Sequence, residues 1–162
     1  WKGERFTVCN SDNLYSVSVL TLLKEAEIPN AVVSYNADAL GVEPERVKAF
    51  AIIKTNDDGS LVEILEKPND EQIAEAKRVA GQIGVNMNVF HFKYDDILKY
   101  VQSEPFNPIR NERELPSAVT RMAKENPGLV TTVPVAENVP DLTSKGDISL
   151  VQKYLVDEFG DF

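Results

Sequence analysis

Three short segments carry side chains whose types and spacing could do chemistry. The first is residues 9–13, where Asp12 follows a β-favouring run and precedes a helical pattern. Open α/β sheets bind ligands at the carboxyl ends of their strands, and a carboxylate there can hold Mg²⁺ together with phosphate oxygens. The alternative, which the local sequence favours, is that Asp12 only caps the helix that follows.

The second segment is Glu66-Lys67-Pro68, at the end of a predicted strand. A glutamate can accept hydrogen bonds from sugar hydroxyls, and a lysine can pair with a phosphate. Neighbouring strand residues point to opposite faces, so both side chains reach one ligand only where the strand ends, which Pro68 favours. The alternative is a solvated ion pair at the end of a strand, which is the commoner state of such a tripeptide.

The third segment is a strand in which Asn86 and Asn88 share one face. A buried amide without a partner costs about 1–3 kcal/mol. The two amides therefore either bind the hydroxyls of a ligand or are satisfied within the protein, and the sequence leaves both open. His91 lies among aromatic residues and is assigned no catalytic role, and Cys9 is expected to be a small buried apolar side chain.

Composition excludes several classes of function. The 162 residues hold 17 Lys and Arg against 26 Asp and Glu, a net charge of −9, which argues against a nucleic-acid surface. No apolar run approaches the roughly 20 residues that a membrane span needs. One Cys and one His exclude a disulfide framework and a Cys/His zinc cluster. The chain begins at Trp1 without a secretory pattern, so we expect a cytoplasmic protein that is a processed product, a trimmed chain or a fragment.

The elements that must position these residues follow from hydrophobic periodicity and turn signals. Strands are predicted at residues 6–10, 31–35, 47–55, 61–65, 84–92 and 129–135, and helices at residues 14–23, 69–80, 94–100, 115–124 and 148–159. The strand–helix–strand order of the first 35 residues implies a parallel crossover and therefore an α/β fold. A turn containing Asp58-Gly59 predicts a hairpin. We predict a single domain, residues 1–162, with its one plausible seam at residues 37–46.

In their order along the chain these segments resemble the sugar-1-phosphate nucleotidyltransferases. Asn10-Ser11-Asp12-Asn13 is similar to the Gly-Asp-Asn segment of the family, and the hairpin ending in Glu66-Lys67-Pro68 is similar to its Glu-Lys-Pro hairpin. Residues 85–92, Glu114-Leu115-Pro116 and residues 141–147 fit the segments that follow. The resemblance runs nearly end to end. It implies a three-layer, Rossmann-like nucleotide-diphospho-sugar transferase fold with a mixed central sheet.

In that family the phosphate of a sugar 1-phosphate attacks a nucleoside triphosphate, giving a nucleotide-sugar and pyrophosphate. The resemblance implies that Asp12 and Asp141 hold Mg²⁺ and act with Lys67 as the catalytic groups. Glu66 would bind sugar hydroxyls and Lys67 the sugar phosphate, and the remaining substrate-binding residues would be Asn13, Asn86 and Asn88. No general base is needed, because the attacking phosphate is already ionised. The implied partners are a nucleoside triphosphate, a sugar 1-phosphate and a second copy of the chain in a homo-oligomer.

The sequence also departs from the family pattern. It has no Gly-x-Gly-Thr-Arg loop to cradle a triphosphate, Asn88 replaces a commoner glycine, and Thr143-Ser144 stands where Gly-Thr is common. We therefore expect the later, sugar-binding part of the domain, incomplete at its N-terminus and inactive alone. One alternative is a non-catalytic sugar-phosphate-binding or regulatory module. A glycosyltransferase of the same general fold ranks last, because Asp12-Asn13-Leu14 lacks the second aspartate of an Asp-x-Asp pair.

Overall fold

A mixed sheet of six strands forms the centre of the computed structural model, which describes residues 2–40, 44–142 and 145–160. The strands are β1 (Arg5–Val8), β2 (Ala31–Asn36), β3 (Ile52–Thr55), β4 (Leu61–Leu65), β5 (Gly84–Lys93) and β6 (Thr131–Val135). The helices are α1 (Val17–Glu25), α2 (Asp70–Ala80), α3 (Tyr94–Ser103), α4 (Leu115–Glu125) and α5 (Ile148–Phe159). Short 3₁₀ helices occupy η1 (Pro44–Ala49) and η2 (Lys145–Asp147).

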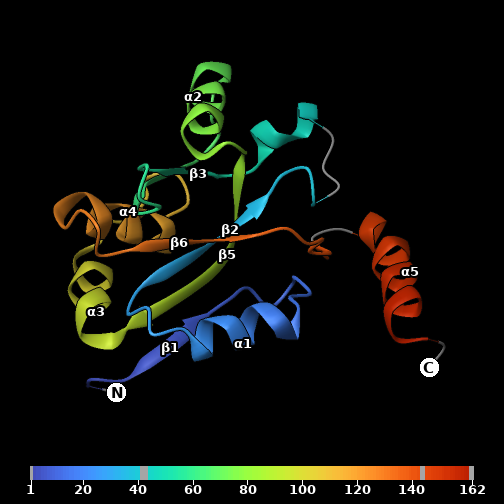
Figure 1. Cartoon of the computed structure of the whole chain (residues 1–162), viewed down its shortest axis with the longest axis horizontal. Helices are drawn as coiled ribbons and strands as arrows, with labels where there is room; N and C mark the ends of the chain where they lie inside the picture. The colour runs from blue at the N-terminus through green and yellow to red at the C-terminus, as the bar shows by residue number, and fades with distance from the viewer. Residues whose placement is uncertain (1, 41–43, 143–144, 161–162) are drawn as a thin grey trace.

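The long strand β5 organises the sheet (Figure 1). Along one edge it pairs antiparallel with β2, which in turn pairs parallel with β6. Its other edge is shared, because β1 pairs with residues 90–93 and β3 pairs with Gly84 and Val85, both antiparallel. Residues 87–89 lie between these two partners. The sheet therefore has a gap on this edge, in the middle of its longest strand.

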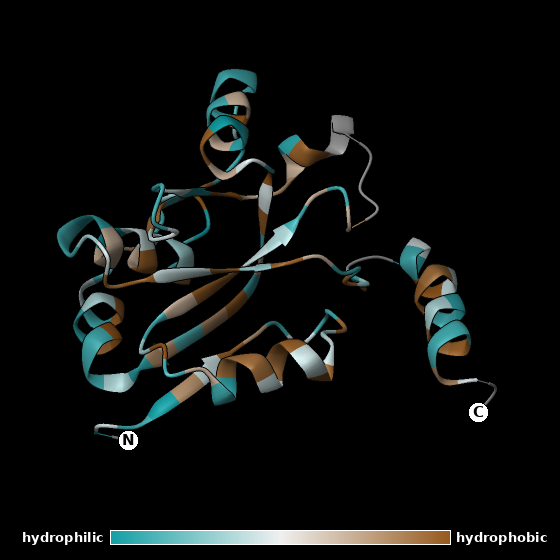
Figure 2. Cartoon of the chain, viewed as in Figure 1, coloured by the Kyte–Doolittle hydropathy of each residue, from teal (hydrophilic) through white to brown (hydrophobic). Residues whose placement is uncertain are grey.

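Helices cover both faces of the sheet (Figure 1). One core cluster joins Val19 and Leu23 of α1 and Ala76 of α2 to residues of β2, β3, β5 and β6. The other joins α3 and α4 to the opposite face, where Phe90 and Phe92 of β5 are fully buried. In Figure 2 the strand β5 carries both hydrophobic and hydrophilic residues, and the outer turns of α2 are hydrophilic. The α/β fold with helical layers around a mixed sheet is thus as predicted.

Local sequence signals account for several of these elements. Asn69 caps α2 through a reciprocal pair of hydrogen bonds with Gln72, each 2.9 Å, and Gly81 closes the helix at φ 74°. The β3–β4 hairpin is confirmed, with an antiparallel ladder on either side of the Asp58-Gly59 turn. β1 and β2 run in the same direction across α1, as the order of elements implied. However, β5 lies between them and runs the opposite way.

Three predictions about the ends of elements are wrong. The helix α1 begins at Val17, after its cap Ser16, whose Oγ accepts from the Val19 N–H at 3.1 Å, so Asp12 is not the cap. The strand predicted from residue 47 begins only at Ile52, because the 3₁₀ helix η1 runs to Ala49. β1 ends at Val8, which leaves Cys9 exposed rather than buried.

Some predicted features lie outside the described residues. These are Trp1, residues 41–43 of the predicted seam, and Thr143 and Ser144 of the closing segment. Among the residues that the structure describes, the longest apolar helices are too short and too polar to cross a bilayer.

Candidate functional site

A bulge in β5 opens the gap between β1 and β3. Asn88 has φ 57°, a left-handed conformation that asparagine tolerates better than most residues. The pairing with β2 shifts at this point, so that five residues of β5, from Asn86 to Phe90, lie opposite the three from Val32 to Ser34. The Asn88 N–H donates to Asn86 Oδ1 at 3.1 Å, and Asn86 Nδ2 donates to Asn88 Oδ1 at 2.9 Å. The pair of asparagines therefore holds the bulge in shape.

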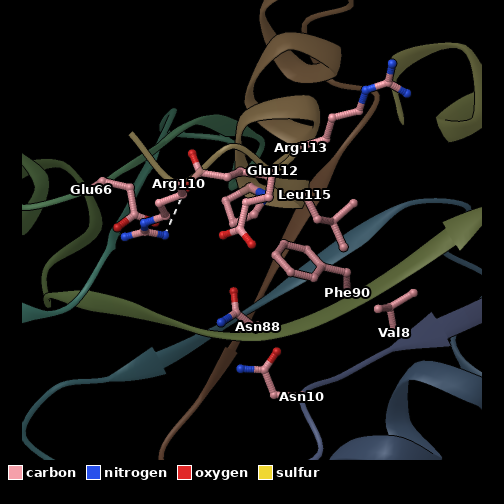
Figure 3. Close-up of a pocket in the computed structure, with 11 residues that line it drawn as sticks. Val8, Asn10, Glu66, Asn88, Phe90, Arg110, Glu112, Arg113 and Leu115 are labelled. Atoms are coloured by element: carbon pink, nitrogen blue, oxygen red, sulfur yellow. Dashed lines mark hydrogen bonds and ion pairs between the residues drawn. The ribbon is translucent and has the colours of Figure 1, made fainter. Parts of the chain in front are cut away.

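A cleft of about 310 Å³ lies beside this bulge (Figure 3). It lies where the end of β1, the end of β4 and the loop before α4 meet β5. Its apolar side chains are Val8, Phe90, Leu115 and Pro116, and its polar ones are Asn10, Glu66, Asn88, Arg110, Glu112, Arg113 and Glu114. An apolar surface with a few convergent polar groups is the usual character of a small-molecule site.

Glu66 and Lys67 take different positions at the end of β4. The strand ends at Leu65, and Lys67 has φ 47°, so the chain turns where Pro68 predicted that the strand would stop. Glu66 lines the cleft together with Asn88, but Lys67 is not among the lining residues. Lys67 lies exposed on the turn next to Glu66. The sequence analysis allowed both side chains to reach one ligand, whereas the structure has only Glu66 among the residues that line the cleft.

The loop before α4 brings an arginine into the cleft. Asn107 Oδ1 accepts from the backbone N–H groups of Ile109 at 2.9 Å and Arg110 at 3.2 Å. Asn107 Nδ2 donates to Glu114 Oε2 at 2.9 Å, and Arg110 Nη1 donates to Glu114 Oε1 at 2.8 Å, the contact drawn in Figure 3. Asn107 and Glu114 thus fix both the backbone and the guanidinium of Arg110.

A second arginine lies at the same cleft. The Arg113 guanidinium stands 5.0 Å from the centre of the Phe106 ring, a cation–π contact. Sequence reasoning missed Arg110 and Arg113, along with Asn10 and Glu112. The available signal was the run of alternating charges at residues 110–114 within a proline-containing loop. The lining holds these two arginines against Glu66, Glu112 and Glu114, and the Arg113 guanidinium points away from Asn88 and Phe90 in Figure 3.

The segments that carry Asp12 and Asp141 pair with each other through their backbones. Asn13 and Asp141 form an isolated antiparallel bridge. The Leu14 N–H donates to Pro140 O at 2.9 Å, and the Leu142 N–H donates to Asp12 O at 2.8 Å. Two carboxylates that are far apart in the sequence thus come from adjacent segments. No cluster of three or more Asp, Glu, His or Cys that could hold a metal occurs in the described part of the chain.

Tyr15 lies between this bridge and the bulge. Its hydroxyl donates to the Met87 carbonyl oxygen at 2.7 Å and lies 3.2 Å from Asn13 Oδ1. Burial raises the pKa of Tyr15 to about 12, and the negative charges of Asp12 and Asp141 act in the same direction. The phenol is therefore neutral and able to donate a hydrogen bond over the physiological range of pH.

His91 occupies a structural position. Its side chain is 5% exposed, and its Nδ1 lies 3.0 Å from Thr7 Oγ1 on the neighbouring strand β1. Burial lowers the pKa of His91, and the positive charge of Arg5 lowers it further. The imidazole is therefore neutral near pH 7, as suits a residue that packs within the sheet.

The structure divides the predicted site residues into two groups. Glu66 and Asn88 both line the cleft, Asn86 is hydrogen-bonded to Asn88, and Lys67 follows Glu66 but does not line the cleft. Asp12, Asn13 and Asp141 meet at the backbone bridge. Tyr15, which sequence reasoning did not select, links the two groups through Met87 and Asn13.

Comparison with known proteins adds to this picture. No family model matches the chain. Among solved structures, it resembles a Bacillus anthracis protein assigned as a glucose-1-phosphate thymidylyltransferase, in complex with a sucrose. The TM-score is 0.66 over 98% of this chain, with 15% sequence identity. The chain spans 58% of the length of that protein. A likeness at this identity establishes the fold: the chain has the Rossmann-like α/β fold, with a mixed central sheet, of that protein.

Proposed function

We propose that this chain supplies the sugar-phosphate side of a nucleotidyltransferase, which joins a nucleoside triphosphate to a sugar 1-phosphate. The observation that carries the proposal is the placement of two groups of residues around one bulge. Glu66 and Asn88 line the cleft, while Asp141, whose segment pairs with that of Asp12, lines a second cavity together with Met87, the neighbour of Asn88 in the bulge. The fold shared with the Bacillus anthracis protein supports the same reaction class.

The cleft has the chemistry to hold a sugar phosphate. The Glu66 carboxylate accepts hydrogen bonds from ring hydroxyls, and the Asn88 amide can donate and accept. Leu115 and Pro116 offer an apolar surface to the C–H face of the ring. Arg110 supplies the positive charge for the phosphate, and we assign Lys67 to the same task from the edge of the cleft.

The residues at the bridge fit a magnesium ion. Mg²⁺ is bound through one or two carboxylates, with water and substrate phosphates completing its coordination. Asp12 and Asp141 are two oxygen donors of this kind, on segments that pair through their backbones. Mg²⁺ held there would neutralise charge on the α-phosphate of the nucleotide.

The reaction needs the chain mainly for binding and alignment. An oxygen of the ionised sugar phosphate attacks the α-phosphorus and forms a new P–O bond. The bond from that phosphorus to the oxygen bridging the β-phosphate breaks, and pyrophosphate leaves with the electron pair. Glu66 and Asn88 hold the ring, and Arg110 and Lys67 orient the attacking phosphate. No general base is required, which agrees with the packed position of His91.

A non-catalytic sugar-phosphate-binding module is the second candidate. One observation favours it: the described residues line a sugar-side cleft, whereas the 162 residues contain no Gly-x-Gly-Thr-Arg loop for a triphosphate. Such a module would bind a sugar phosphate without turnover and without Mg²⁺-dependent affinity for a nucleotide.

A pyrophosphate-release assay tests the first candidate. The 162-residue chain, and any longer product that its gene encodes, would be given glucose 1-phosphate, each nucleoside triphosphate in turn, and Mg²⁺. We expect Mg²⁺-dependent release from the longer product, which Asp12→Ala in that product abolishes. Asp57→Ala, which removes an exposed carboxylate in the hairpin turn, is the matched control and should retain full activity. Full activity in Asp12→Ala would overturn the metal assignment.

Calorimetry separates the two candidates. Titration with glucose 1-phosphate and with nucleotide, each with and without Mg²⁺, gives four affinities. Binding of both substrates, with Mg²⁺ strengthening the nucleotide, supports the transferase. Binding of the sugar phosphate alone supports the module. No binding of glucose 1-phosphate or of any other sugar phosphate would contradict both candidates.

A further inference from the structure

The hydroxyl of Tyr15 contacts both the bulge of β5 and the segment that carries Asp12. We infer that Tyr15 is a positioning residue that ties the carboxylate segment, residues 12–14, to the bulge of β5. Through this tie, the metal side and the sugar side of the site keep a fixed relation. The inference rests on the proposed function, and it deepens that proposal by naming what aligns the two halves.

In the bulge of β5, residues 87–89 pair with no strand along the gap in the described sheet, so their backbone groups need other partners. The Asn88 N–H is satisfied by Asn86 Oδ1, and the Met87 carbonyl oxygen by the Tyr15 hydroxyl at 2.7 Å. Tyr15 thus holds the residue that immediately precedes Asn88, which lines the cleft.

The Tyr15 hydroxyl also reaches the carboxylate segment. It lies 3.2 Å from Asn13 Oδ1, and the backbone of Asn13 pairs with Asp141. A continuous series of contacts therefore runs from Met87 through Tyr15 and Asn13 to Asp141. Asn88, on the sugar side, follows Met87 in the chain, and Asp12, on the metal side, precedes Asn13.

The ring of Tyr15 is itself fixed in place. It packs against the core cluster that α1 shares with the sheet. The next residue, Ser16, caps α1 and donates its hydroxyl to Glu137 Oε1 at 2.8 Å. Because the core packs against the ring of Tyr15 and the following residue is fixed by hydrogen bonds, Tyr15 loses little further conformational freedom when its hydroxyl aligns its neighbours. A preorganised site has this requirement.

Tyr15→Phe removes the hydroxyl and little else. Tyr94→Phe is the matched control, because no hydrogen bond of the Tyr94 hydroxyl occurs among the described residues and Tyr94 begins α3, away from the bridge. Amide hydrogen exchange of the free protein provides the first measurement. In Tyr15→Phe we expect the Leu14 and Leu142 amides to exchange about fivefold faster, the effect of losing one hydrogen bond. Exchange in β2 should not change.

Binding of Mn²⁺, used as a paramagnetic probe for the carboxylate pair, provides the second measurement. We expect Tyr15→Phe to weaken Mn²⁺ about fivefold and Tyr94→Phe to leave it unchanged. A purely structural tyrosine would not alter this affinity once the protein is folded. In a double-mutant cycle, Asn13→Ala should weaken Mn²⁺ less in the Tyr15→Phe background than alone, because the two residues act in series.

The outcomes distinguish this inference from the proposed function. Unchanged exchange at Leu14 and Leu142 would show that Tyr15 does not tie the segments, whatever the protein catalyses. Faster exchange with unchanged Mn²⁺ affinity would make Tyr15 structural only and overturn the inference while leaving the proposed function intact. Failure of the unmodified protein to bind Mn²⁺ would overturn the metal assignment and the positioning role together.

Discussion

Asn86 and Asn88 bind each other in both directions across the bulge of β5. Asn86 donates its amide to Asn88 Oδ1 at 2.9 Å and accepts the Asn88 N–H at 3.1 Å. The sequence left open whether these amides serve a ligand or each other. The structure shows the internal bonds, and it also places Asn88 on the wall of the cleft. The pair thus shapes the bulge that the candidate site needs.

The left-handed backbone at Asn88 leads to a prediction about stability. Asn88→Gly loses the hydrogen bond that Asn88 Oδ1 accepts from Asn86 but adopts φ 57° without strain. Asn88→Ala loses the same bond and also carries the steric cost of the left-handed region, about 1–2 kcal/mol. Urea denaturation should therefore find the alanine variant less stable than the glycine variant by about 1 kcal/mol. Equal stability of the two would mean that the bulge relaxes.

The positive charges near the cleft predict a ranking of affinities. Hydrogen bonds to charged groups contribute about 1.5–3 kcal/mol, so Arg110→Gln should weaken glucose 1-phosphate at least tenfold. Lys67 is exposed at the edge, so Lys67→Gln should have a smaller effect, about threefold. Arg78→Gln, on the exposed side of α2, is the control for net charge. Calorimetry with glucose, which lacks the phosphate, should show no loss in any variant, and a loss there would contradict the assignment.

Gly84 makes a close approach that a double-mutant cycle can test. A Cβ atom at Gly84 would lie 2.1 Å from Ser34 Oγ but 3.5 Å from Ser34 Cβ. Gly84→Ala should therefore lower the free energy of unfolding by about 1–3 kcal/mol, as overpacking does. Adding Ser34→Ala removes the clashing oxygen and should restore most of that loss. Additive effects of the two substitutions would contradict the proposed clash.

The pKa of Tyr15 leads to a prediction at high pH. Its value of about 12 in the folded protein lies above the ordinary value of 10. The unfolded chain therefore loses this proton first, so the stabilisation is complete below about pH 10 and is lost as the pH rises to about 12. Tyr15→Phe should show a shallower loss of stability over this range. The late-titrating part of the tyrosinate absorbance should shrink in this variant without disappearing, because burial also raises the pKa of Tyr35, and an unchanged titration curve would contradict the assignment.

Local signals in the sequence predicted much of the fold. Asn69 and Gly81 mark both ends of α2, and the Asp58-Gly59 turn marks the hairpin, because capping and turn chemistry act within a few residues. The start of α1 could not be found in this way. Residues 12–14 pair with residues 140–142, which keeps them extended and delays the helix to Val17. A contact between such distant segments leaves no local signal.

The sequence indicated individual residues of the candidate site but not how they are arranged in space. Glu66, Asn88, Asp12 and Asp141 were selected from the sequence and its resemblance; the structure places the first two in one cleft and Asp141, beside the segment of Asp12, in a second cavity that Met87 also lines. Arg110 was missed because its position depends on Asn107 and Glu114, which fold the loop back on itself. Tyr15 was missed because its partner, the Met87 carbonyl oxygen, belongs to the backbone, which no side-chain pattern reveals.

The gap along β5 also bears on how the protein avoids association. An open strand edge is a template on which another chain can add a strand. Here the Tyr15 hydroxyl already engages the Met87 carbonyl oxygen, and Asn86 engages the Asn88 N–H. The left-handed turn at Asn88 also breaks the straight row of backbone groups. The gap therefore offers no ladder to an incoming strand, so the bulge that borders the cleft also protects this edge of the sheet from strand addition.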